Sequence, residues 1–192
     1  MTLKEQFIEA PFYSRLAHRT EGFTKIIEHL ESSSTLNQII ETGTSRIQDN
    51  WEGDGQSTLI WDWVAERCSV SATSIDISSE YVNIAKSQTK HVNYIVGDSV
   101  QTLSSFPLEI LNKVSLLYLD SFDWSPEQHL DSCFHHMAEL ASVWAKLPSG
   151  CMVVVDDCHS EFAGKHVMVY LFMSKLGIRP AFTGYQSGWI KP

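Results

Sequence analysis

Aspartates stand at the ends of two apolar runs in this 192-residue chain. The run VSLLYLDSFD (Val114–Asp123) contains Asp120, and the run CMVVVDDCHS (Cys151–Ser160) contains Asp156 and Asp157. A short aliphatic run suits a strand that is buried on both faces, as in a parallel sheet. Because a carboxylate buried inside such a strand costs several kcal/mol, we expect these aspartates where the strands end. In an open α/β sheet, that edge is where ligands bind.

Three earlier segments also place small or polar residues where a strand is expected to end. Gly43, in the segment IIETGTSR, lets the backbone turn closely past a ligand, and the following helix N-terminus offers N–H donors to a carboxylate or phosphate. Asp76 ends the segment ATSID and is placed to accept hydrogen bonds from a ribose diol. Asp98 and Ser99 follow the third run, VNYIVG, and are suited to contact an adenine edge.

Expected strands and helices alternate along the chain. The hydrophobic pattern predicts strands over residues 36–41, 72–78, 92–98, 114–120 and 151–157, and helices over residues 23–30, 57–68, 79–90, 99–105 and 162–176, with a further helix starting at Ser125. Residues 178–192 indicate two short strands joined at Gly184. This alternation predicts an α/β, Rossmann-like, doubly wound and mostly parallel sheet of about seven strands, with helices on both faces and a C-terminal antiparallel hairpin.

Composition favours one domain with a small-molecule ligand. The expected domain spans residues 1–192, with an N-terminal helical cap segment (1–35) and a Rossmann-like core (36–192). A net charge of −9 argues against nucleic acid as a partner. No apolar stretch suits a signal peptide or approaches the ~20 residues of a membrane span, so no membrane partner is expected. Four cysteines without a CxxC pair indicate a reducing, cytoplasmic setting, and a homodimer is left open.

The segments IIETGTSR, SIDIS, VGDS and LYLDS, in this order and followed by a terminal hairpin, resemble the class I S-adenosylmethionine-dependent methyltransferases. A dinucleotide-binding fold is the rival, but GxGxxG needs a glycine where Ser45 stands. The resemblance covers nearly the whole chain after residue 35 and implies S-adenosylmethionine as the cofactor. It also implies these contacts to the cofactor: Glu41, Gly43, Thr44, Ser57 as helix N-cap, Asp76, Ile77, Asp98, Ser99 and Asp120.

An additional stretch, Ile47–Asp54, separates ETGTSR from the helix, where many members of this class pass directly into the helix. One interpretation is a lid, in which Trp51 covers the cofactor and Arg46 or Asn50 touches substrate. The alternative is a solvated loop.

The acids of the fourth and fifth strands resemble those of the cation-dependent, catechol-type O-methyltransferases. The resemblance implies Asp120, Asp156 and Asp157 as ligands of a divalent cation, Mg²⁺ or Ca²⁺, because three converging carboxylates repel one another without a cation among them. Such a metal would bind a substrate hydroxyl and lower its pKa. The alternative is that these aspartates cap helices or contact cofactor and substrate.

The general base is less well defined. Catechol-type enzymes carry a lysine three residues after the fourth-strand acid, and this chain has Asp123 there. His159 is therefore the first candidate base, because imidazole titrates near neutral pH, and Asp123 is the second. Asp120 is the third residue assigned to catalysis. His129, His135 and His136 are expected on the helix over the sheet, far along from the ligand edge, as packing or solvent-facing groups. Cys158, next to the acid pair, is expected to be a bystander.

These assignments predict metal-assisted O-methylation of a hydroxylated small molecule, such as a sugar or a secondary metabolite. Aromatic residues are candidates to line the acceptor pocket, namely Trp124, Phe12, Tyr13 and His18. Two alternatives are a non-catalytic binding module of the same fold and a hydroxylase on the same scaffold.

Overall fold

A computed structural model describes residues 1–33, 36–160 and 162–192 of the chain. Its main sheet contains β1 (Gln38–Thr42), β2 (Ser71–Asp76), β3 (Val92–Val96), β4 (Val114–Leu119), β5 (Met152–Val155) and β8 (Ser187–Ile190). The helices are α1 (Leu3–Ile8), α2 (Thr20–Ser32), α3 (Ser57–Cys68), α4 (Ser79–Gln88), α5 (Ser99–Ser105), α6 (Leu108–Leu111), α7 (His129–Val143) and α8 (Val167–Lys175). Short 3₁₀ helices cover Tyr13–Arg15, Ala17–Arg19 and Trp144–Lys146.

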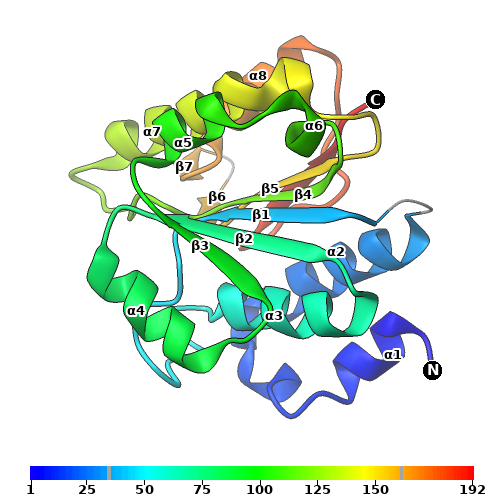
Figure 1. The fold of residues 1–192 in the computed structure, drawn as a ribbon. Coiled ribbons are helices and arrows are strands. Elements are labelled where there is room, and N and C mark those ends of the chain that lie inside the picture. Colours follow the sequence, from blue (N-terminus) through cyan, green and yellow to red (C-terminus); the bar gives the residue numbers. More distant parts are fainter. Residues whose placement is uncertain (34–35, 161) are drawn as a thin grey trace.

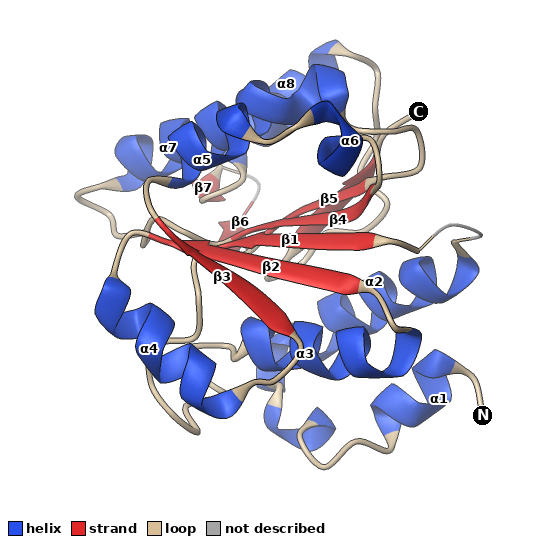
Figure 2. Cartoon of the chain, viewed as in Figure 1, coloured by secondary structure: helices blue, strands red, loops and turns tan. Residues whose placement is uncertain are grey.

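The sheet separates two layers of helices. In Figures 1 and 2, α1 to α4 lie on one face of the sheet and α5 to α8 on the other. The strand order is β3-β2-β1-β4-β5-β8, and every neighbouring pair is parallel except β5 and β8. The chain therefore winds outward from β1 in one direction and from β4 in the other. The crevice between the ends of β1 and β4 is the place where such sheets bind ligands.

The predicted doubly wound α/β fold is confirmed, but the sheet has six strands instead of seven. β8 is a single antiparallel edge strand, and Phe182 pairs with Gly188 in an isolated bridge where the first strand of a hairpin was expected. Pro180 lacks an N–H to donate to a ladder. The side chains of Tyr185 and Gln186 turn inward, where they donate hydrogen bonds to Asp157 (2.6 Å) and Tyr118 (2.5 Å).

A short hairpin replaces the beginning of the last predicted helix. Strands β6 (Cys158–Ser160) and β7 (Ala163–Gly164) pair between β5 and α8, so the helix begins at Val167 and not at residue 162. Gly164 has φ +123°, and a Cβ atom there would lie 2.5 Å from the carbonyl oxygen of Asp157. The glycine therefore lets the hairpin fold back closely onto the end of β5.

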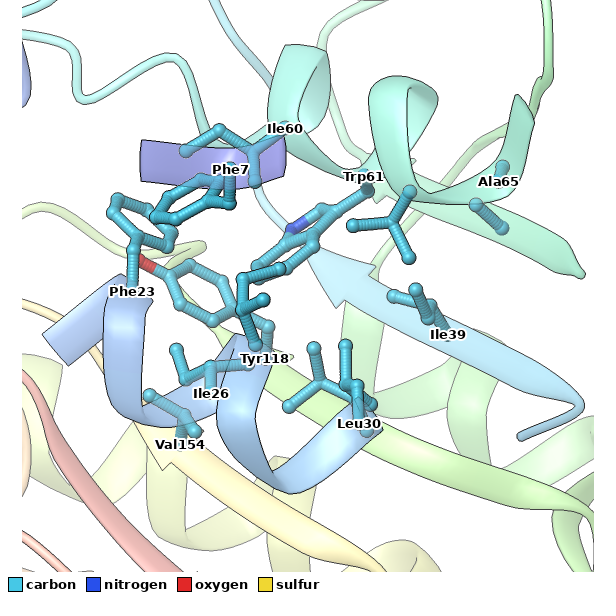
Figure 3. Close-up of a cluster of buried hydrophobic side chains, with 14 of the residues drawn as sticks. Phe7, Phe23, Ile26, Leu30, Ile39, Ile60, Trp61, Ala65, Tyr118 and Val154 are labelled. Carbon is cyan, nitrogen blue, oxygen red and sulfur yellow. The ribbon is translucent and has the colours of Figure 1, made fainter. Parts of the chain in front are cut away.

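Aromatic side chains join the N-terminal helices to the sheet. Figure 3 shows this cluster, in which Phe23 of α2, Trp61 of α3 and Tyr118 of β4 are completely or almost completely buried. The ring centroids lie 5.9 Å apart for Phe23 and Tyr118 and 5.2 Å apart for Trp61 and Tyr118. α2 and α3 thus share one hydrophobic core with β4. Within the described residues, no helix combines the length and apolar character that crossing a membrane requires.

The Ile47–Asp54 stretch packs against the N-terminal segment. Trp51 is 8% exposed, and its ring stacks on Phe12 with centroids 5.2 Å apart and planes 6° apart. The Arg15 guanidinium lies over the same ring, 5.5 Å from its centroid. The prediction that Trp51 covers a cofactor is therefore wrong, because the indole is held in the core formed with the N-terminal segment.

Glu41 is the centre of a buried hydrogen-bond network that joins β1, α3 and β2. Its carboxylate is 1% exposed and accepts hydrogen bonds from Ser57 Oγ (2.5 Å), Thr58 Oγ1 (2.7 Å), Trp61 Nε1 (3.0 Å) and Ser74 Oγ (2.7 Å). Burial raises the pKa of Glu41 to about 7, although these four donors favour the charged form. This network fixes the start of α3 beside the end of β1.

We expect Trp51→Ala to lower the free energy of unfolding by about 3 kcal/mol, because it removes a buried, stacked ring. The affinity for S-adenosylhomocysteine should remain at its wild-type value. Urea unfolding and calorimetry measure the two quantities. Wild-type stability combined with a large loss of affinity would contradict the packing role and restore the lid.

We expect Glu41→Gln to change the pH dependence of stability. A folded pKa of about 7 against 4.5 in the unfolded chain means that the folded protein binds the proton more tightly. The resulting stability, about 3 kcal/mol, is fully present below pH 4.5 and lost as pH rises through 7. Urea unfolding between pH 5 and pH 8 should show this loss in the wild type and in the surface variant Glu28→Gln, and a flatter profile in Glu41→Gln. Equal slopes in all three proteins would refute the assignment.

Candidate functional site at the strand ends

A cleft lies at the carboxyl ends of the parallel strands and consists of two adjoining cavities. Their volumes are about 310 and 180 Å³, and they share Gly43, Asp76, Ile77 and Ser121. The larger cavity is also lined by Ile75, Asp98, Ser99, Phe122 and His135, and the smaller one by Thr44, Arg46, Asp54, Ser57, Tyr81, Asp120 and Asp123. We call the two together the strand-end cleft. It brings together every predicted cofactor contact except Glu41, whose carboxylate is enclosed by α3 and β2.

The turn after β1 brings the backbone close to the end of β4. Gly43 has φ +81°, and a Cβ atom there would lie 2.4 Å from the carbonyl oxygen of Asp120. A side chain at this position would push β1 and β4 apart, so glycine is required. The Ser57 hydroxyl faces Glu41, and the N-cap of α3 is Gln56, which corrects the predicted N-cap by one residue.

Asp76 orders the turn and faces the cleft. Its Oδ2 accepts a hydrogen bond from the N–H of Thr44 (3.1 Å), and its Oδ1 accepts one from the N–H of Ser78 (2.7 Å). Burial raises the pKa of Asp76, and these two donors oppose that effect. Each carboxylate oxygen has a second lone pair, so the group can accept further hydrogen bonds from a diol. Ile77 beside it is 75% exposed and supplies an apolar surface.

The larger cavity ends at α5 and α7. Asp98 caps α5 by accepting a hydrogen bond from the N–H of Gln101 (2.8 Å). Ser99 Oγ lies 3.0 Å from His135 Nε2, and the Phe122 ring lies 5.5 Å from the His135 ring. The expectation that His135 packs or faces solvent away from the ligand edge is therefore wrong. The sequence pattern concealed this position, because it is set by tertiary contacts with Ser99 and Phe122.

A buried glutamate supports this end of the cleft. Glu139 is 0% exposed. Its Oε1 lies 3.4 Å from His135 Nε2 and accepts a hydrogen bond from Ser121 Oγ (2.6 Å). Although burial acts to raise it, the pKa of Glu139 is lowered to about 2, mainly by His135 and His136. The hydrogen bond that His135 donates to Glu139 raises the pKa of His135. No pattern in the sequence predicted the pairing of Glu139 with His135.

The three aspartates of the predicted metal site converge, as expected, but each contacts a cationic side chain. We call Asp120, Asp156 and Asp157 the acidic cluster. Lys165 Nζ lies 2.5 Å from Asp120 Oδ1 and 2.9 Å from Asp157 Oδ2. Arg19 Nε lies 3.0 Å from Asp156 Oδ2, and Arg19 Nη2 lies 3.2 Å from Asp157 Oδ1. Lys165 is 1% exposed and Arg19 is 4% exposed.

The electrostatics of the cluster follow from this pairing. Although burial acts to lower it, the pKa of Lys165 is raised by Asp120 and Asp157, so the ammonium stays charged. Although burial acts to raise it, the pKa of Asp157 lies well below its ordinary value because of Lys165 and the hydroxyl of Tyr185. Burial raises the pKa of Asp120, and Lys165 opposes that effect.

This arrangement does not fit a bound Mg²⁺ or Ca²⁺. Across residues 1–33, 36–160 and 162–192, no group of three or more His, Cys, Asp or Glu side chains is arranged to hold a metal ion. Both oxygens of Asp156 already accept hydrogen bonds from the protein: Oδ1 accepts from the N–H of Asp157 (2.9 Å), and Oδ2 accepts from Arg19 and from Tyr118 (2.8 Å). The expected metal site at Asp120, Asp156 and Asp157 is therefore not shown by the described residues, and cationic side chains of the protein lie between these carboxylates.

The two candidate bases lie in different places. Asp123 lines the smaller cavity together with Asp120 and pairs with Arg46 (2.7 Å). His159 lines a separate cavity of about 550 Å³, and its ring centroid lies 4.3 Å from that of Trp124. Other residues lining that cavity are Cys158, Ser160, His166, Tyr170, Pro180, Thr183, Gly184, Tyr185 and Ser187.

The remaining acceptor candidates divide between this region and the core. His18 lies against Tyr185, with centroids 4.0 Å apart, at the edge of the acidic cluster. Phe12 and Tyr13 instead pack on Phe7 in the core. Cys158 is buried, which raises the pKa of its thiol and makes it a poor nucleophile.

Comparisons with known proteins find folds similar to that of this chain among methyltransferases. No protein-family model matches the sequence, and no curated sequence matches it significantly. Three similar solved structures are the TDP-rhamnose 3'-O-methyltransferase CalS11 of calicheamicin biosynthesis (TM-score 0.65, 12% identity, 96% of this chain and 86% of that one), the O-methyltransferase NovP (0.64, 14%, 99% and 95%) and the mycinamycin-pathway methyltransferase MycE in complex with Mg and SAH (0.63, 13%, 100% and 55%). The predicted resemblance is confirmed at the level of the fold: the chain has the fold of the class I S-adenosylmethionine-dependent methyltransferases.

Proposed function

We propose that this protein is an S-adenosylmethionine-dependent methyltransferase that methylates a hydroxyl group of a small molecule of the sugar type. The observation that carries the proposal is the strand-end cleft, which gathers Gly43, Asp76, Asp98 and Ser99 at the crevice between β1 and β4. The names of similar structures support the acceptor class, because they include a TDP-rhamnose O-methyltransferase and the O-methyltransferase NovP.

The two cavities suit the two ends of the cofactor. In the larger cavity, Phe122 and Ile77 offer apolar surface for an adenine ring, and Asp98 and Ser99 offer hydrogen-bonding groups for its edge. Asp76, shared by both cavities, would hold the ribose diol. The smaller cavity, lined by Thr44 and Ser57, would hold the methionine end and open toward Asp120 and Asp123. S-adenosylmethionine supplies an electrophilic methyl group bound to a sulfonium.

Asp123 is the better placed general base. It shares the smaller cavity with Asp120, whereas His159 lines the separate 550 Å³ cavity. In the proposed step, the acceptor oxygen forms a bond to the methyl carbon while the carbon–sulfur bond breaks and leaves its electron pair on sulfur. The hydroxyl proton passes to the Asp123 carboxylate. Arg46, which pairs with Asp123, orients that carboxylate.

The separate cavity is the proposed acceptor pocket. Tyr185 and His159 give it aromatic faces, on which sugar rings pack. His166 also lines this cavity, and its buried Nδ1 has no hydrogen-bond partner within the described part of the chain. Trp124 follows Asp123 in the chain, and its ring lies 4.3 Å from that of His159, so the residue after the proposed base lies beside a residue that lines this pocket.

We expect Asp76→Ala to weaken binding of S-adenosylhomocysteine at least about tenfold, because it removes the acceptor of the diol hydrogen bonds and loosens the turn at Thr44. Isothermal calorimetry measures the effect. Asp62→Ala is a matched control, since Asp62 also accepts two backbone hydrogen bonds, from Lys90 (2.7 Å) and His91 (2.6 Å), outside the cleft. Equal affinities of Asp76→Ala and wild type would remove the cofactor assignment.

We expect Asp123→Asn to lower kcat for methyl transfer by about 100-fold or more, because an amide cannot accept the hydroxyl proton. His159→Gln should mainly raise KM for the acceptor, since His159 lines the pocket. Transfer of a radiolabelled methyl group to a panel of nucleotide sugars, glycosides and phenols gives both constants. A larger loss of kcat in His159→Gln than in Asp123→Asn would reverse the assignment, and no transfer to any hydroxylated acceptor would refute the proposed reaction.

A further inference from the structure

We propose that Lys165 is a built-in cation that takes the place of a divalent metal ion in the acidic cluster, so that methyl transfer by this protein is independent of metal. The inference rests on the proposed methyltransferase function for the nature of the reaction. The position of Lys165 among the three carboxylates rests only on the contacts in the structure. Lys165 contacts Asp120, which lines the smaller cavity, and therefore acts on the reaction as a positioning residue.

The Lys165 ammonium lies where a metal would have to lie. Nζ is 2.5 Å from Asp120 Oδ1 and 2.9 Å from Asp157 Oδ2. Calcium lies ~2.3 to 2.6 Å from its oxygen ligands, and magnesium lies closer. A cation bridging the same two oxygens would overlap the ammonium, so Lys165 and a metal exclude each other.

The fold holds Lys165 in this position. Gly164 allows the β6–β7 hairpin to lie against the end of β5, and the N–H of Lys165 donates to the carbonyl oxygen of Asp157 (3.2 Å). The backbone that carries Lys165 is thus anchored to one of the two carboxylates that its side chain bridges. Withdrawal of the side chain would leave the Asp120 carboxylate without its cation and Asp157 with Arg19 alone.

Both oxygens of the third carboxylate, Asp156, already accept hydrogen bonds from the protein. Arg19 and Tyr118 donate to its Oδ2, and the N–H of Asp157 donates to its Oδ1. Arg19 is itself fixed, because its Nη1 also donates to the carbonyl oxygen of Glu52 (3.0 Å) and its guanidinium lies 4.6 Å from the centroid of the Tyr185 ring. Two side-chain cations, Arg19 and Lys165, thus contact all three carboxylates. These contacts hold the carboxylates in place without an ion from solution.

The first test measures metal binding by the wild-type protein, after treatment with EDTA and dialysis. Titration with Mn²⁺, followed by calorimetry and by electron paramagnetic resonance, should detect no stoichiometric site, and EDTA should leave the rate of methyl transfer unchanged. One Mn²⁺ bound per chain and lost in Asp157→Asn would overturn the inference. So would loss of methyl transfer in EDTA that is reversed by Mg²⁺.

The second test removes the ammonium. We expect Lys165→Met to gain one Mn²⁺ site, so that millimolar Mn²⁺ raises its unfolding temperature by about 5 °C and leaves the wild type unchanged. Its kcat should fall about 100-fold without metal and recover in part with Mg²⁺ or Mn²⁺, because the metal re-forms the bridge to Asp120. A folded Lys165→Met variant that binds no Mn²⁺ would overturn the inference.

Lys191→Met is the matched control. Lys191 Nζ donates to the carbonyl oxygens of Trp144 (2.7 Å) and Leu147, outside the acidic cluster, so its loss should create no metal site and change no kinetic constant. If Lys165→Met does not fold, the wild-type arms still decide the question. Calorimetry with S-adenosylhomocysteine is run in parallel: absence of binding would refute the proposed function, while the Mn²⁺ titration would still decide the role of Lys165.

Discussion

The pairing of three strand-end carboxylates with two buried cations is the constraint on which the rest of this structure depends. Arg19 comes from the N-terminal segment, Asp120 from the end of β4, and Lys165 from the residue after the β6–β7 hairpin. Each charge would be costly to bury alone, and removal of one partner would leave the other charge buried and unpaired. The network therefore requires three distant parts of the chain to meet at the ligand edge of the sheet, and it fixes how the N-terminal helices and the C-terminal loop sit around the cleft.

The other acids at or near the sheet lie in different electrostatic environments. Glu41 is surrounded by hydroxyls and an indole N–H, with no cation beside it, and burial raises its pKa to about 7. Glu139 lies beside two histidines, and its pKa is lowered to about 2. Asp76 and Asp123 face the cleft and keep lone pairs available. The acids that hold the structure together are thus the enclosed ones, whereas the acids suited to ligands are those at the ends of β2 and β4.

The local pattern of the sequence predicted much of the fold, and the residues that it proposed as cofactor contacts, apart from Glu41, line the strand-end cleft. The helix over residues 57–68 and the short helix over 99–105 were predicted at the observed residues, because apolar periodicity and capping residues are local signals. The expected terminal hairpin is present only as β8 and an isolated antiparallel bridge between Phe182 and Gly188. The sequence pattern contained no sign that Tyr185 and Gln186 point inward to Asp157 and Tyr118. Trp51 and His135 were placed wrongly for a similar reason: each is positioned by a tertiary contact, with Phe12 and Ser99 respectively.

The acidic cluster shows why the pattern of ligands alone does not identify a metal site. Asp120, Asp156 and Asp157 have the residue types and positions that an oxygen-binding cation requires, and electrostatic repulsion does require a cation among them. The source of that cation is set elsewhere in the chain. Arg19 stands 137 residues before Asp156 and belongs to no recognisable motif, and Lys165 reaches the cluster because Gly164 permits a close turn. Repulsion among carboxylates thus predicts that positive charge is present, while the tertiary fold decides whether a side chain or a metal ion supplies it.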